Sequence, residues 1–114
     1  MDDRLPEVAE HGGRVKPFDA IATAYCACAV CCGQDASETA SGRPPRVGVT
    51  IAAPRSVPFG TWVELRIPGV GTLRRRVDDR THRRFDGRWD VFVADHRQAQ
   101  LFGRKRATVR VIKP

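Results

Sequence analysis

Long apolar runs are missing from this chain of 114 residues. A helix that crosses a bilayer needs about 20 mostly apolar residues, and no uninterrupted apolar stretch approaches that length. We therefore expect a soluble protein without a membrane span. Residues 1–7 also lack the basic start and apolar core of a secretory signal. The chain is expected either not to be exported by that route, or to have lost its signal and gained a Met.

Aromatic residues are few, with five Phe, two Trp and one Tyr. Most of them lie inside apolar runs, so we expect them in a core and not on a surface that stacks bases. The chain is basic all the same, with a net charge of +7 and a sequence pI near 10.1, which favours polyanions or an acidic wall. Its clusters at 74–76 and 104–106 lie in strand-like segments, where successive side chains alternate between faces. The composition argues against nucleic acid as the partner.

Cysteine is absent from most of the chain, and all four cysteines fall within seven positions, as Cys26, Cys28, Cys31 and Cys32. Adjacent Cys31 and Cys32 are poorly placed to bridge each other, so disulfides would pair them with Cys26 and Cys28. Four thiolates could instead hold a structural zinc ion in one loop. Disulfides, zinc and reduced thiols stay as three alternatives, and each would brace a loop. No nearby histidine marks any of these cysteines as an activated nucleophile.

The rest of the chain predicts many short strands. Residues 1–17 are polar and are expected to form a flexible arm, followed by one domain over 18–114. Six segments have the composition or alternation of strands, at 18–25, 47–53, 61–67, 72–77, 89–93 and 107–112. A short helix is expected between Asp95, which can cap its start, and Gly103, which can close its end. Regularly spaced turns among such strands predict a mainly β protein that closes into a small barrel.

Two acidic residues mark the place where chemistry is expected. Asp79 ends one strand-like segment and Asp90 lies at the start of the next, on either side of a polar turn at Asp86 and Gly87. Two carboxylates held together cannot both ionise without cost, so one acquires a raised pKa and can donate a proton near neutral pH. The alternative is that both acids form solvated ion pairs with nearby arginines.

Taken in order, these segments resemble the three-aspartate (3D) domain over residues 22–112. That domain belongs with the double-psi β-barrels of rare lipoprotein A, the catalytic region of membrane-bound lytic transglycosylase A, and the stationary-phase survival muralytic proteins. The matching blocks are Ala22-Thr23-Ala24-Tyr25, Cys32-Gly33, Thr39-Ala40-Ser41-Gly42, Val57-Pro58-Phe59-Gly60-Thr61, Val77-Asp78-Asp79, Gly87-Arg88-Trp89-Asp90-Val91-Phe92, and finally His96, Ala99 and Phe102-Gly103. The resemblance implies a six-stranded double-psi β-barrel with one short helix.

The resemblance also implies a site that cleaves peptidoglycan glycan strands. Asp90 would be the catalytic acid and Asp79 its partner, while Ala53 stands where the first of the three aspartates is expected. The implied substrate-binding residues are Tyr25, Thr39, Ser41, Gly42 and His96. Two of these have a structural alternative: Tyr25 as a core residue with its hydroxyl in water, and His96 as a surface histidine of the capping turn. For Trp62 and Trp89 we expect packing and not sugar stacking.

A lytic transglycosylase fits a site with a missing aspartate. One carboxylic acid suffices, because the sugar's own C6 hydroxyl replaces water as the nucleophile, and no cofactor is required. We therefore expect a muralytic domain that acts at the cell wall, in a phage virion or as a phage-encoded protein. The alternative is a catalytically inactive wall-binding or structural module of a virion or wall assembly on the same fold.

Overall fold

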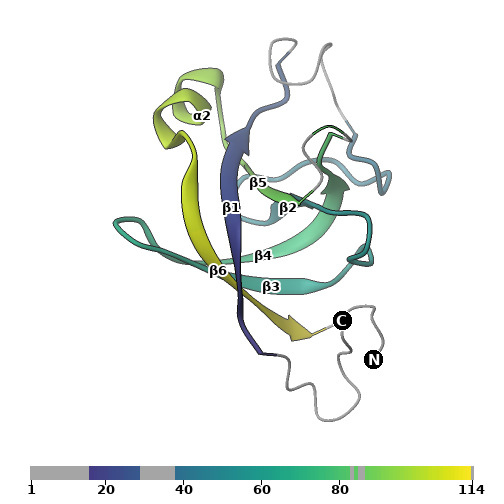
Figure 1. The fold of residues 1–114 in the computed structure, drawn as a ribbon. Helices are drawn as coiled ribbons and strands as arrows, with labels where there is room; N and C mark the ends of the chain where they lie inside the picture. Colours follow the sequence, from purple (N-terminus) through teal and green to yellow (C-terminus); the bar gives the residue numbers. More distant parts are fainter. Residues whose placement is uncertain (1–15, 29–37, 83, 85–86, 114) are drawn as a thin grey trace.

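The protein is described by a computed structural model over residues 16–28, 38–82, 84 and 87–113. Its strands close into one barrel in the order β1-β5-β2-β4-β3-β6 (Figure 1). The elements are β1 (Phe18–Tyr25), β2 (Thr50–Ala53), β3 (Trp62–Ile67), β4 (Gly71–Arg80), β5 (Arg88–Phe92), α2 (His96–Phe102) and β6 (Lys105–Lys113). The predicted mainly β fold, a closed six-stranded double-psi barrel with one short helix, is confirmed for the described residues. Most of the predicted arm at 1–17 lies outside them.

The barrel mixes parallel and antiparallel pairs. β1 runs parallel to β5, and β2 runs parallel to β4. The other neighbours, β1 with β6, β2 with β5, β3 with β4 and β3 with β6, are antiparallel. Because parallel strands cannot be joined by a tight hairpin, the parallel neighbours are not consecutive along the sequence.

The turn between β3 and β4 follows from its residues. Proline presets the first central position of a type II turn, and glycine supplies the positive φ that the second requires. Pro68 and Gly69 occupy these positions, with Gly69 at φ 84, and the Val70 N–H donates to the Ile67 carbonyl at 2.9 Å. β3 and β4 therefore form a hairpin.

Apolar side chains that alternate along the strands fill the barrel. The core contains Ala22, Ile51, Ala53, Val57, Val63, Leu65, Ile67, Val77, Trp89, Val91, Ala107, Val109 and Val111. Trp89 is packed as predicted, at 2% exposure. Trp62 is only half-buried, and the guanidinium of Arg76 lies 5.9 Å from its ring centre.

Two strand boundaries differ from the prediction by three residues, and the other differences are smaller. β2 begins at Thr50 and not at residue 47, because Val49 and Thr50 donate their N–H groups to the Arg46 carbonyl and close a turn. β4 continues to Arg80, past the predicted end at residue 77, because its last residues pair with β2. Asp79 therefore lies within a strand and not at the mouth of a loop.

Helix α2 starts and ends at the predicted caps. The Asp95 side chain accepts a hydrogen bond from the Gln98 N–H at 2.8 Å, and the Gly103 N–H donates to the Ala99 carbonyl. The Gln98 side chain accepts from the Ala94 N–H at 3.3 Å, one residue earlier than in a capping box. None of the helices in the described ranges is long and apolar enough to cross a membrane.

Candidate functional site

Four neighbouring strands each contribute one residue to a single row across the barrel wall. Thr23 of β1 is in register with Asp90 of β5, Asp90 with Ala52 of β2, and Ala52 with Asp79 of β4. Residues in register on paired strands point to the same side of a sheet. Trp89, next to Asp90, points into the core, so the row faces outward. The fold therefore brings both predicted acids to one face, with only Ala52 between them.

Asp90 occupies an environment that favours its protonated form. Its side chain is half-buried, and the Thr23 hydroxyl donates a hydrogen bond to Oδ1 at 2.8 Å. Burial raises the pKa of Asp90, and the negative charge of Asp79 acts in the same direction. The Thr23 hydrogen bond and the positive charge of Arg88 oppose this shift, but the pKa still lies above its usual range. Asp90 therefore keeps its proton to a higher pH than an exposed aspartate does.

The Asp79 side chain accepts three hydrogen bonds. The Tyr25 hydroxyl donates to Oδ2 at 2.7 Å. The backbone N–H groups of Ala40 and Arg80 donate to Oδ1, each at 2.9 Å. The Tyr25 ring packs edge-on against Phe92, with ring centres 5.3 Å apart. The structure therefore brings Tyr25 to Asp79, and the alternative in which its hydroxyl points only into water is wrong.

The predicted residues Thr39, Ser41 and Gly42 form a tight loop beside Asp79. The Thr39 and Ser41 hydroxyls lie 2.9 Å apart, and the Thr39 hydroxyl donates to the Arg43 carbonyl at 2.8 Å. Gly42 has φ 90 and donates its N–H to the Thr39 carbonyl. The Ser41 N–H donates to the backbone carbonyl of Asp78, the residue before Asp79, at 3.1 Å. This loop is thus fastened to β4 next to the acid.

Asp78 does not supply a further acid to the row. It is the extra residue at a register shift, since Val77 pairs with Ile51 and Asp79 pairs with the following Ala52. Its side chain is fully buried. Arg76 donates to it through Nε, at 2.9 Å to both oxygens, and through Nη2 at 2.8 Å.

Ala53 does not belong to the outward-facing row either. It has no exposed surface and belongs to the core. The residue between the two acids is its neighbour Ala52, which is also buried, at 2% exposure. The row therefore presents two carboxylates.

The structure places the predicted residue His96 with the cysteines. Its Nδ1 lies 3.8 Å from the Cys28 Sγ, although the two residues are 68 positions apart in the chain. The prediction that no histidine lies near the cysteines is therefore wrong, because α2 packs beside the end of β1. Cys26 and Cys28 carry thiol sulfurs 3.1 Å apart. Cys31 and Cys32 lie outside the described residues, so the predicted disulfide pairing stays a prediction.

Sequence reasoning missed one residue of the site, Thr23. The signal was present, because alternation along β1 puts Thr23 and Tyr25 on the same face while Ala22 enters the core. Each of the two donates a hydroxyl hydrogen bond to a different acid of the row. β1 thus positions both carboxylates.

Comparison with known proteins identifies the architecture. No protein-family model and no curated protein match the chain. Among solved structures it is similar to apo expansin from Clavibacter michiganensis, with a TM-score of 0.60 and 20% sequence identity over 86% of this chain and 51% of that chain. The barrel has an expansin-like fold. This chain spans about half the length of that expansin, and at such low identity the likeness establishes the fold alone.

Proposed function

We propose that this barrel acts on the glycan strands of peptidoglycan as a lytic transglycosylase, with Asp90 as its acid and base. The observation that carries the proposal is a half-buried carboxyl with a raised pKa, in the same outward-facing row as a second carboxylate. Such an acid carries the proton that cleavage of a glycosidic bond requires. The resemblance to the three-aspartate domain supports a cell-wall glycan as the substrate, and the expansin-like fold agrees with that resemblance.

The proposed reaction uses one carboxyl group twice. Thr23 holds Oδ1 of Asp90, which leaves Oδ2 to carry the proton. Asp90 donates this proton to the glycosidic oxygen as the bond to the anomeric carbon breaks. The resulting carboxylate takes the proton of the C6 hydroxyl of the same sugar, whose oxygen bonds to the anomeric carbon. The products are a 1,6-anhydro sugar end and a free hydroxyl on the leaving strand, and Asp90 is protonated again.

Asp79 would assist through its charge. Its hydrogen bonds from Tyr25, Ala40 and Arg80 fix its position. A negative charge near the reacting sugar stabilises the positive charge that develops at the anomeric carbon. It also contributes to the raised pKa of Asp90. The hydroxyls of Thr39 and Ser41 lie beside it as candidate partners for sugar hydroxyls.

The test is digestion of purified sacculi, with mass spectrometry for 1,6-anhydro products. Wild type is expected to release them and Asp90→Asn to lose at least about 100-fold in rate, the usual contribution of an acid–base group. Asp19→Asn is the matched control, because Asp19 is exposed at the other end of β1, and it should retain full activity. Absence of anhydro products from wild type across pH 4 to 8 would overturn the proposal.

A wall-binding module without catalysis is the second candidate. Ala53 favours it, because the resemblance implies an aspartate at this position and the chain has none there. The net charge of +7 would favour adsorption to an acidic wall. Wild type and Asp90→Asn would then sediment equally with sacculi and neither would release anhydro products. A place in a phage virion or a wall assembly is part of this second candidate.

A further inference from the structure

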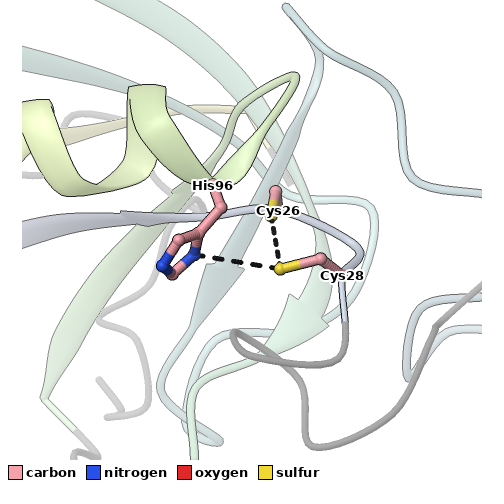
Figure 2. A group of neighbouring side chains, drawn as sticks. All are labelled: Cys26, Cys28 and His96. Atoms are coloured by element: carbon pink, nitrogen blue, oxygen red, sulfur yellow. Dashed lines mark hydrogen bonds between the residues drawn. The ribbon is translucent and has the colours of Figure 1, made fainter.

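Three ligand-type side chains meet where β1 approaches α2. Cys26 directly follows β1, Cys28 comes two residues later, and His96 is the first residue of α2 (Figure 2). The Val93 N–H donates to the Tyr25 carbonyl at 2.8 Å, which holds the two segments side by side. The Nδ1 edge of the imidazole faces the Cys28 sulfur, and the Cys26 sulfur also lies next to the Cys28 sulfur, so that the three ligand atoms form a compact group (Figure 2). Backbone pairing therefore positions this group independently of any ion.

The distances within the group suit a small metal ion. One ligand atom from each residue lies within 4.8 Å of the others. The two sulfurs are 3.1 Å apart, and the Cys28 sulfur is 3.8 Å from His96 Nδ1. With Zn–S near 2.3 Å and Zn–N near 2.0 Å, ligand atoms of a tetrahedral zinc site lie roughly 3.5–3.8 Å apart. The distance from the Cys28 sulfur to His96 Nδ1 already fits, and the sulfur pair needs to open by roughly half an ångström.

The donor types select the metal. Thiolate sulfur and imidazole nitrogen bind zinc well, whereas calcium and magnesium require oxygen ligands. Cys26 is 2% exposed, and Cys28 and His96 are half-buried, so the pair of sulfurs is shielded while the site stays open to an entering ion. A disulfide between Cys26 and Cys28 would close only a very short loop and would stabilise the chain little.

We propose that Cys26, Cys28 and His96 bind one zinc ion that fastens the start of α2 to the end of β1. The ion takes two thiolates and the imidazole Nδ1, and a further donor completes its tetrahedron. Its role is structural, because it lies next to the end of β1. The last residue of that strand is Tyr25, whose hydroxyl donates a hydrogen bond to Asp79. The metal would therefore hold the end of the strand that positions both acids. This inference does not depend on the proposed catalysis.

The first test uses metal content and cobalt as a spectroscopic probe. Protein reduced and reconstituted with zinc is expected to retain one zinc per chain after gel filtration. Cobalt(II) added to the reduced, metal-free protein should give a sulfur-to-cobalt charge-transfer band that saturates at one equivalent and disappears on addition of zinc. Less than about 0.2 zinc per chain, or cobalt binding without the charge-transfer band, would overturn the proposal; roughly full occupancy is expected because structural zinc sites bind tightly.

The second test assigns the ligands. His96→Ala and Cys28→Ser should each weaken zinc affinity by at least about tenfold, since even outer-shell partners of zinc ligands contribute that much. His82→Ala is the matched control, because His82 is exposed and outside the group, and it should bind zinc like wild type. The circular dichroism of His96→Ala shows whether the barrel is intact. Equal affinity of wild type and a folded His96→Ala, or equal loss in His82→Ala, would refute the assignment.

Discussion

At the scale of single residues, the environment that raises the pKa of Asp90 also makes its ionised form unfavourable for folding. Asp90 is half-buried beside Ala52 and in register with Thr23, where burial disfavours the charged carboxylate and raises its pKa. Functional sites commonly contain groups whose pKa is shifted in this way. The same shift must appear in the pH dependence of folding.

The sign of this pH dependence follows because the pKa of Asp90 is higher in the folded protein than in the unfolded chain. In the pH window between the two, the folded protein binds more protons, so stability falls as pH rises. Each unit of separation weakens the fold at neutral pH by about 1.4 kcal/mol. We expect Asp90→Asn, which cannot ionise, to be more stable than wild type at pH 7. The difference should shrink on acidification and vanish below the ordinary aspartate pKa of about 3.9.

Urea unfolding of both proteins at a series of pH values measures this difference. Other titrating groups contribute equally to the stability of both proteins, so their contributions cancel in the difference. One such group is Glu64, whose pKa is lowered chiefly by its hydrogen bond from Arg110. A stability difference that is independent of pH would contradict the assignment of a raised pKa to Asp90.

Asp78, unlike Asp90, is an acid whose side chain is fully buried in an ion pair with Arg76. It is fully buried and accepts hydrogen bonds from Nε and Nη2 of Arg76. Asp78→Asn should lower the free energy of unfolding by about 2–3 kcal/mol, because it replaces charge-assisted hydrogen bonds in a dry site. The loss stays below that of a wholly buried pair because the Arg76 side chain is 22% exposed.

Chemical denaturation measures the effect of Asp78→Asn. Asp19→Asn is the control, and an exposed substitution of this kind should change stability by less than about 0.5 kcal/mol. A loss as small as that of the control would show that the contacts with Arg76 do not stabilise the fold. Neighbouring aspartates thus have separate roles, and their letters in the sequence did not distinguish them.

At the scale of elements, the helix was the part most fully predictable. Asp95 and Gly103 carry local signals that the structure reproduces at both ends. We expect Asp95→Ala to lower stability by about 1 kcal/mol, because the Gln98 N–H loses its acceptor. Thermal unfolding should show a decrease of several degrees in Tm. Asp95→Asn is the matched control, since asparagine caps as well as aspartate does; an equal loss in both variants would mean that the cap hydrogen bond is not the cause.

The strands were predictable in place but not in every boundary or environment. Glu64 of β3 alternates with the core residues Val63 and Leu65, yet its own exposure is only 6%. Arg74 of β4 and Arg110 of β6 are in register with it on either side and their side chains contact its carboxylate. Arginine stems can cover such a position, and only the pairing of strands reveals it. The end of β4 was missed for the same reason, since β2 extends it.

At the scale of the whole molecule, the sequence predicted the closed sheet and the two acids but not their arrangement. The turn residues and strand spacing were sufficient for a barrel. The row from Thr23 through Asp90 and Ala52 to Asp79 depends on which strands become neighbours, and local patterns do not encode this. The meeting of His96 with Cys28 depends equally on the packing of α2 against β1.

The parallel pairs also constrain how the chain folds. Residues of the row come from four separate strands, and Thr23 lies 67 positions from Asp90. Contacts over such separations form slowly, because a long loop must lose conformational entropy on closing before the contact can stabilise the chain. The row of Thr23, Asp90, Ala52 and Asp79 therefore exists only when all four strands occupy their places in the barrel wall.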